Sequence, residues 1–150
     1  MRKTCIFLDF DGVLNNSRTK AVMPLGYVGI SDRLMKRLSR IIEESGADVV
    51  LTTSWKEYWD TENEVKAYVC KKFNRFRIFI KGRIEHEPAN CRGYLVKQFL
   101  KEHPYDNYVL LDDETFDYYR QNMVDHLVLA NERDGLTDKD VEKAIEILKK

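Results

Sequence analysis

Short apolar runs of strand length alternate with helical patterns along the whole chain, and this alternation limits the possible folds more than any other sequence feature. The runs expected to form strands are Thr4–Leu8, Asp48–Leu51, Arg77–Ile80, Tyr108–Leu111 and His126–Leu129. Helical spacing is present over Ser31–Ser45, after Thr61, over Arg92–Glu102 before Pro104, and after Thr137. Strands that alternate with helices favour an α/β fold, a Rossmann-like three-layer sandwich around a mostly parallel sheet. We therefore expect one domain over residues 1–150.

Some of the expected helices have end signals. Ser31 or Asp32 is a suitable N-cap for the first helix, and Gly46 is a suitable end for it. Thr61 and Glu64 have the spacing of a capping box, which predicts that the second helix begins directly after Thr61.

Composition excludes several classes of protein. Basic and acidic residues balance at 25 each, so net charge does not draw the chain toward nucleic acid or an anionic membrane. Cys5, Cys70 and Cys91 form no CxxC pair, which argues against a zinc site or a disulfide framework. We expect reduced thiols and a cytoplasmic protein, with no membrane-spanning stretch and no obligate protein partner.

Polar side chains follow three of the expected strands. In a parallel sheet, active sites lie beyond the carboxyl ends of the strands, so the residues after Leu8, Leu51 and Leu111 should converge. These residues are Asp9, Phe10, Asp11, Thr52, Thr53, Ser54, Asp112 and Asp113.

The converging carboxylates indicate metal-assisted chemistry. Four carboxylates in one cleft cannot all stay ionised without a cation. Oxygen ligands without His or Cys favour Mg²⁺ over zinc or copper. Gly12 gives the chain freedom to turn, so that Asp9 and Asp11 can reach one phosphoryl group. One of the two aspartates can then attack phosphorus while the other handles the proton of the leaving group.

Other groups at the strand ends suit phosphate binding. The Thr52 hydroxyl can bind a phosphate oxygen, and the backbone N–H groups of Thr53 and Phe10 can do the same. An in-line displacement also needs a fixed cation from the protein to balance the developing charge.

These motifs resemble those of the haloacid dehalogenase (HAD) superfamily. Residues 9–14, with the sequence DFDGVL, are similar to its first motif, and residues 49–52, VVLT, to its second. Residues 110–113, LLDD, together with Asp117, are similar to its fourth motif. The motifs occur in the order of the superfamily and span most of the chain.

The resemblance implies a role for each matching residue. Asp9 would be the nucleophile and a magnesium ligand. Asp11 would be the general acid and base, with its backbone carbonyl also on Mg²⁺, and Thr52 would bind the phosphoryl group. Asp113 would complete the metal site.

Two further acidic residues have supporting roles in this scheme. Asp112 would lie beside the metal site or in the shell of residues around it, and Asp117 would belong to the same shell.

The third motif of the superfamily departs from its usual form. The superfamily has a lysine at a helix start shortly before the acidic pair, whereas this sequence has Arg92 followed by Gly93. Arginine can hold a phosphate through two hydrogen bonds, so the role can survive the change. Lys97 in the same helix and Lys81 upstream are the alternatives.

A narrower resemblance is to the HAD domain of Swiss Army Knife RNA-repair proteins. It rests on residues 8–15, 52–55, 92–93, 108–113 and 135–137. The spaces between the motifs are partly used by core elements, so a full cap domain does not fit. An open site suits bulky substrates, because small ones need a lid for enclosure. Polynucleotide ends and phosphoproteins are therefore the candidate substrates, and we expect phosphorylated ends of RNA or DNA.

Two segments near the motifs have alternative interpretations. Residues 71–83 combine six basic residues with three phenylalanines and could bind a single strand, or they could form a solvated helix end with the rings in the core. Trp55, Tyr58 and Trp59 could line the site, form a loop lid or pack in the core. The histidines have no metal spacing and are expected to be structural or exposed; they are His86, His103 and His126.

The leading functional hypothesis is a magnesium-dependent phosphomonoester hydrolase with an aspartyl-phosphate intermediate, acting on polynucleotide 5′ or 3′ phosphate ends. The alternatives are a phosphatase or phosphotransferase of small metabolites or nucleotides, and a catalytically silent HAD-like binding module. Dehalogenation is disfavoured, because Asp11 would then be unneeded.

Overall fold

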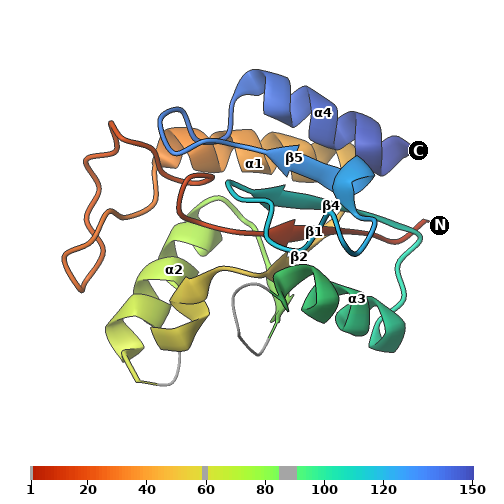
Figure 1. Cartoon of the computed structure of the whole chain (residues 1–150). Coiled ribbons are helices and arrows are strands. Elements are labelled where there is room, and N and C mark those ends of the chain that lie inside the picture. Colours follow the sequence, from red (N-terminus) through yellow and green to blue (C-terminus); the bar gives the residue numbers. More distant parts are fainter. Residues whose placement is uncertain (1, 59–60, 85–90) are drawn as a thin grey trace.

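The computed structural model describes residues 2–58, 61–84 and 91–150, which form a three-layer α/β sandwich around a parallel sheet (Figure 1). The strands are β1 (Thr4–Leu8), β2 (Asp48–Leu51), β3 (Ile80–Arg83), β4 (Asn107–Asp112) and β5 (Leu127–Leu129). Their order in the sheet is β3-β2-β1-β4-β5, and every neighbouring pair is parallel. The fold class expected from the alternation of strands and helices is confirmed.

Helices cover both faces of this sheet. They are α1 (Asp32–Ser45), α2 (Asn63–Arg75), α3 (Arg92–Glu102) and α4 (Asp138–Lys149), with the 3₁₀ turns η1 (Ser54–Tyr58) and η3 (Val124–His126). Figure 1 shows α1 and α4 side by side on one face and α3 on the opposite face. β1 is the middle strand, and all five of its residues are buried.

Successive side chains of β1 point to opposite faces of the sheet, and the core on the two faces forms two clusters. Ile6 and Leu8 pack with the apolar sides of α1, α2 and α4, while Cys5 and Phe7 face α3. The Phe7 ring meets the Phe99 ring of α3 edge to face, with 5.8 Å between centroids. Because β1 is buried on both faces, the backbone at its end is fixed, and so is the position of the polar residues that directly follow Leu8.

The expected caps are present at the first and last helices. The Ser31 hydroxyl accepts from the backbone N–H of Leu34, so Ser31 is the N-cap of α1, and Gly46 ends that helix with a φ of +67°. Thr137 opens α4 in a capping box with Asp140.

The predicted capping box at Thr61 is wrong. α2 begins at Asn63, Glu62 holds the N-cap position, and no side chain caps the helix. The backbone N–H groups of Thr61 and Glu62 both donate to the carbonyl of Tyr58, so the turn that ends η1 holds Thr61 before the helix starts.

The third strand begins three residues later than predicted. Arg77 has a φ of +58°, its N–H donates to the carbonyl of Asn74, and the N–H of Ile78 donates to the carbonyl of Phe73. These are the two hydrogen bonds of a Schellman motif, and Phe73 and Ile78 form its buried apolar contact. Residues 76–78 therefore terminate α2, and β3 starts only at Ile80.

The segments between the strands contain no separate cap within the described part of the chain. Residues 9–31 form a loop bridged between Val22 and Val28, and η1 and α2 follow β2. No helix among the described residues is both long and apolar enough to cross a membrane. The three cysteines are free thiols.

Candidate active site

The carboxyl ends of β1, β2 and β4 lie side by side at one edge of the sheet. Leu8 is in register with Leu51 on one side and Leu111 on the other. The N–H of Asp9 donates to the Leu111 carbonyl at 3.0 Å, and the N–H of Thr52 donates to the Leu8 carbonyl at 2.9 Å. The polar residues after the three strands therefore do converge.

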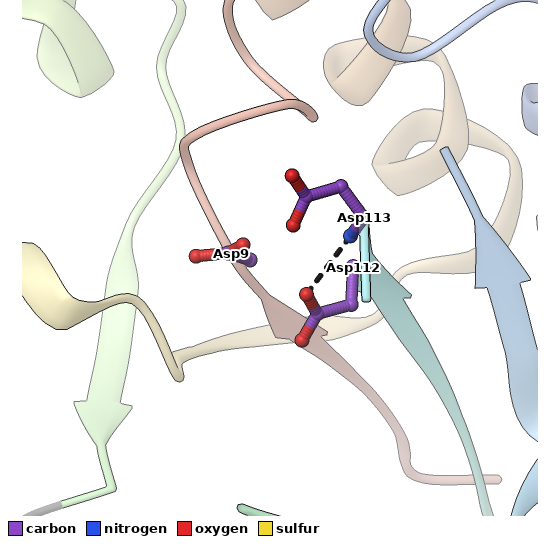
Figure 2. Close-up of side chains that lie close together, drawn as sticks. All are labelled: Asp9, Asp112 and Asp113. Carbon is purple, nitrogen blue, oxygen red and sulfur yellow. Dashed lines mark hydrogen bonds between the residues drawn. The ribbon is translucent and has the colours of Figure 1, made fainter. Parts of the chain in front are cut away.

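Three carboxylates gather at this edge: Asp9 after β1, and Asp112 and Asp113 at the end of β4 (Figure 2). One oxygen from each lies within 4.8 Å of the others. Asp112 is fully buried, Asp9 is 6% exposed, and Asp113 is half-buried. All the donors are oxygens, which suits a hard divalent cation such as Mg²⁺.

The electrostatics of the cluster also favour a cation. Burial raises the pKa of Asp9 well above its usual range, Asp112 raises it further, and Arg92 acts in the opposite direction. Burial, Asp112 and Glu114 raise the pKa of Asp113 to about 6. Carboxylates whose ionised forms are disfavoured in this way are stabilised as anions when a divalent ion joins them.

Asp112 is held by donors on both of its oxygens. Its Oδ2 accepts from Arg92 Nη1 at 2.9 Å and from the Tyr118 hydroxyl at 2.8 Å. Its Oδ1 accepts from the backbone N–H of Asp113 at 2.8 Å, the dashed line in Figure 2, and from that of Glu114 at 3.3 Å. The Asp112 carboxylate therefore holds the backbone of Asp113 and Glu114 on one side and the Arg92 side chain on the other.

Arg92, the first residue of α3, is the cation that contacts the cluster. Its side chain is 6% exposed, and its Nη1 lies 3.6 Å from Asp9 Oδ1. Burial acts to lower the pKa of Arg92, but Asp112 and Asp9 more than offset this and raise it. The Phe116 ring lies 4.2 Å from the guanidinium carbon, and Phe116 has a φ of +41°. Arg92 is thus held as a charged group by carboxylates and a ring.

The alternative cations lie elsewhere. The side chains of Lys81 and Lys97 are exposed, and neither forms an ion pair with the described part of the acidic cluster. Of the three candidates, the structure brings Arg92 to Asp9.

Asp117 fixes the start of α3. Its Oδ1 accepts from the N–H of Gly93 at 2.5 Å, and its Oδ2 accepts from the N–H of Tyr94 at 2.9 Å. An added Cβ at Gly93 would lie 2.9 Å from Asp117 Oδ1, so the glycine allows this close approach. Asp117 thereby acts through the helix that carries Arg92, apart from the three clustered carboxylates.

Asp11 is exposed, and its carboxylate is held away from this cluster. Its Oδ1 accepts from Asn15 Nδ2 at 3.0 Å, and its Oδ2 accepts from Trp55 Nε1 at 3.0 Å. Asn15 also accepts from the N–H of Gly12 at 2.9 Å, which closes the turn. Gly12 has a φ of +78°, and a Cβ there would overlap the Asp113 carboxylate. The turn therefore requires glycine twice over.

Thr52 offers an unused hydroxyl beside the carboxylates. Its Oγ1 is buried, and it has no hydrogen-bond partner among the described residues. A buried orphan of this kind is costly unless a ligand satisfies it, and a phosphate oxygen would do so. Thr53 is also buried, and its hydroxyl accepts from the N–H of Trp55 at 3.2 Å. The backbone N–H of Phe10 acts to lower the pKa of Asp9.

Residues 5–141 match the protein family described as the HAD domain in Swiss Army Knife RNA repair proteins. The chain belongs to this HAD family. The match spans β1 to the first part of α4 and includes every site residue described above. A search of curated proteins gives no match to the chain.

Residues 71–83, the segment of this HAD domain that combines basic residues with phenylalanines, take part in core packing and in ion pairs. Phe73 is buried and Phe76 packs against the core, while Phe79 is 78% exposed. Lys72 Nζ lies 2.8 Å from Asp32 Oδ1, and Arg75 Nη1 lies 3.3 Å from Asp32 Oδ2. The interpretation that places rings in the core therefore holds for two of the three phenylalanines.

The structure also tests the predictions made for the aromatic residues after Thr53 and for the histidines. Trp55 is buried in the core and its Nε1 also donates to Asp11, so core packing and site lining both hold for it. Tyr58 likewise packs against the core and lines the pocket beside Asp11. His86 and Trp59 lie outside the described residues. His126 stacks on Tyr108 with 3.9 Å between ring centroids, and His103 packs against Phe99 in a tilted arrangement at 4.5 Å. These two histidines therefore have packing roles.

Sequence reasoning missed several residues of this HAD domain. Asn15 orients Asp11, Phe116 covers Arg92, and Tyr118 donates to Asp112. Asn15 follows Asp11 at the spacing of a side chain that bonds back to its own turn, and that signal could have identified it. The other two depend on the fold of residues 113–118, for which the sequence has no periodic signal.

Proposed function

We propose that this HAD domain is a Mg²⁺-dependent phosphomonoester hydrolase that forms an aspartyl-phosphate on Asp9. The observation that carries the proposal is the position of Asp9, buried beside Arg92 at 3.6 Å and one strand away from the orphan hydroxyl of Thr52. A nucleophilic carboxylate, a cation and an unsatisfied hydroxyl at one edge of the sheet suit the attack on a phosphoryl group.

The reaction proceeds in two displacements. An oxygen of Asp9 attacks phosphorus, and the bond from phosphorus to the leaving oxygen breaks as Asp11 gives that oxygen a proton. Water then attacks the same phosphorus and gives a proton to Asp11. The bond between phosphorus and Asp9 breaks, which releases phosphate and restores both carboxyl groups.

The fixed orientation of Asp11 supports its role as general acid and base. Hydrogen bonds from Asn15 and Trp55 hold one oxygen each, so the carboxyl group keeps a defined position two residues from the nucleophile. Arg92 and the Thr52 hydroxyl bind the phosphoryl oxygens, together with the backbone N–H groups of Phe10 and Thr53.

The donor set supports the binding of Mg²⁺. Asp9, Asp113 and the backbone carbonyl of Asp11 would hold the ion, with Asp112 and Asp117 in support. Asp9, Asp112 and Asp113 bring oxygens within 4.8 Å of one another. When bound, the ion neutralises charge on the phosphoryl oxygens.

The proposed substrates are the 5′ or 3′ phosphate ends of polynucleotides, in a cytoplasmic protein. The description of the family as RNA repair proteins supports this substrate class. So does the pocket beside Asp11, which is lined by side chains of a loop and of η1 and not by a cap domain. An unenclosed site accepts a chain end that a lid would exclude.

The experiment that tests the activity is a phosphate-release assay on a chromogenic phosphomonoester. Activity should require Mg²⁺ and disappear in Asp9→Asn, and mass spectrometry of quenched enzyme should find phosphate on the peptide that contains residue 9. Phosphate release without any phosphorylated peptide, at full activity in chelator, would contradict the proposal. A panel of phosphorylated oligonucleotides, nucleotides and sugar phosphates then tests the substrate class by kcat/KM.

A further inference from the structure

A pocket of about 340 Å³ opens next to Asp11. The residues that line it with Asp11 are Met23, Tyr27, Val28, Ser54, Trp55 and Tyr58. Three of these side chains are aromatic. Because Asp11 delivers the proton to the leaving oxygen in the proposed reaction, a pocket that borders Asp11 is where the leaving group of the substrate lies.

The loop that forms one wall of this pocket presents apolar side chains to solvent. Val22, Tyr27 and Val28 are 63%, 65% and 46% exposed, and Leu25 is 37% exposed. Apolar side chains gathered on one exposed loop indicate a surface that something else covers. The opposite wall is firm, because Trp55 is 3% exposed and its ring meets the Phe10 ring edge to face at 5.1 Å.

The loop is held in place by backbone hydrogen bonds. The N–H of Met23 donates to the Tyr27 carbonyl at 3.0 Å, and the N–H of Gly29 donates to the Ala21 carbonyl at 2.7 Å. Figure 1 shows the loop, coloured red to orange, extending to the left beyond the carboxyl ends of the strands. The backbone at Tyr27 therefore has a defined position, and the Tyr27 side chain lines the pocket.

A second pocket, of about 280 Å³, is strongly cationic. It is lined by Arg18, Lys20, Arg33 and Lys72, with Asp32 as the one acidic residue. Lys72 is paired with Asp32 at 2.8 Å, but Lys20 and Arg33 form no ion pair within the part of the chain that the structure describes. A pocket with this charge suits a phosphate group.

A third pocket, of about 440 Å³, joins the other two across the catalytic edge. It shares Asp11 and Val28 with the aromatic pocket and Asn16 with the cationic pocket, and Asp113 also lines it. The three pockets therefore adjoin one another around Asp11, Asn16 and Val28, so that aromatic rings, carboxylates and cations all border this region.

We propose that the aromatic pocket stacks the terminal base of a polynucleotide, while the cationic pocket binds a phosphate of its backbone. The proposal rests on the proposed function, and it specifies which part of the substrate each surface recognises. Bases stack on aromatic side chains whatever their sequence, and basic residues bind the backbone. The pairing of an aromatic pocket with a cationic pocket favours a nucleotide chain over a phosphotyrosyl peptide, which needs the ring pocket alone.

The test compares two oligonucleotides that carry the same terminal phosphate and differ only in whether the terminal residue has a base. The wild-type enzyme should prefer the base-bearing substrate by about ten- to a hundredfold in kcat/KM, the range that a stacked base contributes. Tyr27→Ala should reduce this preference by about tenfold, mainly through KM. Tyr119→Ala is the matched control, because Tyr119 is 78% exposed and does not line the pocket.

The cationic pocket has its own measurement. The double variant Lys20→Ala/Arg33→Ala should raise KM for the oligonucleotide by about tenfold or more and make KM less dependent on salt, because fewer counterions are released. For a mononucleotide with one phosphate, the same variant should change KM far less. Equal changes for both substrates would overturn the assignment of this pocket to the backbone.

A binding measurement separates this inference from the proposed activity. Asp9→Asn protein should bind the base-bearing oligonucleotide more tightly than the abasic one in fluorescence anisotropy, and adding Tyr27→Ala should reduce this difference by about tenfold. If the wild type hydrolyses neither substrate but this difference remains, the proposed function fails and the recognition of the base stands. Equal affinity for the two oligonucleotides, or a higher kcat/KM for a phosphotyrosyl peptide, overturns the inference.

Discussion

Arg92 Nη1 lies 3.6 Å from Asp9 Oδ1, so the positive charge of the guanidinium reaches the proposed nucleophile directly. The same nitrogen donates to Asp112 at 2.9 Å. One arginine therefore restrains two buried carboxylates and remains close enough to meet a phosphoryl oxygen attached to Asp9.

Arg92→Ala should lower kcat by far more than Lys97→Ala, because Lys97 is exposed and forms no ion pair with the clustered carboxylates. It should also destabilise the fold by about 3–5 kcal/mol, because it leaves the fully buried Asp112 without its cation. Arg92→Lys keeps a positive charge but loses the planar guanidinium group, so its kcat should lie between those of Arg92→Ala and Lys97→Ala. Steady-state kinetics and denaturant unfolding check both effects, and a larger loss in Lys97→Ala would move the role to that lysine.

Asp9→Asn should abolish turnover and leave the fold intact, because an amide is a poor nucleophile at phosphorus. In chelator the variant should melt at a higher temperature than the wild type, because it removes a buried charge whose pKa is raised by burial and by Asp112. Activity near that of the wild type would rule out the covalent mechanism, and circular dichroism provides the control for folding.

Asp11→Asn should lower kcat by about 10²- to 10⁴-fold, the usual contribution of general acid–base catalysis. The amide keeps the size of the side chain and one acceptor oxygen for Asn15 or Trp55. The loss should be smaller on substrates whose leaving group is a weak base, such as nitrophenol, because such a group needs less protonation. An equal loss on good and poor leaving groups would argue against a proton transfer by Asp11.

A chelator should remove activity and Mg²⁺ should restore it. Asp113→Ala should then raise the Mg²⁺ concentration needed for half-maximal activity by tenfold or more, because it deletes one of three clustered carboxylates. Asp125→Ala is the matched control, since Asp125 is an exposed carboxylate outside the cluster. A titration of activity against Mg²⁺ measures both variants, and identical curves for Asp113→Ala and the wild type would exclude Asp113 as a ligand.

Asp32→Asn should tighten the binding of an oligonucleotide and steepen its salt dependence, because it frees Lys72 and Arg75 from their ion pairs. The hydrogen bond and charge of Lys72 lower the pKa of Asp32 below its usual value. The pair therefore stabilises the wild type at neutral pH, and this contribution is lost only as pH falls through the lowered pKa. Melting temperatures of the wild type and Asp32→Asn should converge in that acidic range.

The sequence was sufficient to predict the elements with a clear apolar periodicity and the residues with a motif at the end of a strand. β1, β2 and the ends of α1 follow from apolar spacing, the hydroxyl of Ser31 and the backbone freedom of Gly46. The convergence of residues after three strands follows from the parallel sheet itself.

The errors arose where a turn overrode local pattern. Arg77 takes up a left-handed conformation that usually requires glycine, so the apolar run that follows it reads as a strand although its first residues end a helix. Thr61 matches a capping box, but the preceding turn already uses its backbone.

The proposed recognition pockets could be predicted only in part. Trp55, Tyr58 and Lys72 belong to segments that the sequence singled out, and they do line these pockets. Tyr27, Lys20 and Arg33 lie in or beside an irregular loop, and only the folded backbone brings them to Asp11 and Lys72.

The cap that Asp117 provides for α3 also sets an order of assembly. Gly93 and Tyr94 come before Asp117 by 24 and 23 residues, and Arg92 comes before Asp112 by 20. During synthesis from the N-terminus, the third helix therefore leaves the ribosome before the groups that complete its first turn. Until β4 and the loop after it have been made, Arg92 lacks Asp112 as a partner, so we expect the candidate active site to be completed late in the maturation of the nascent chain.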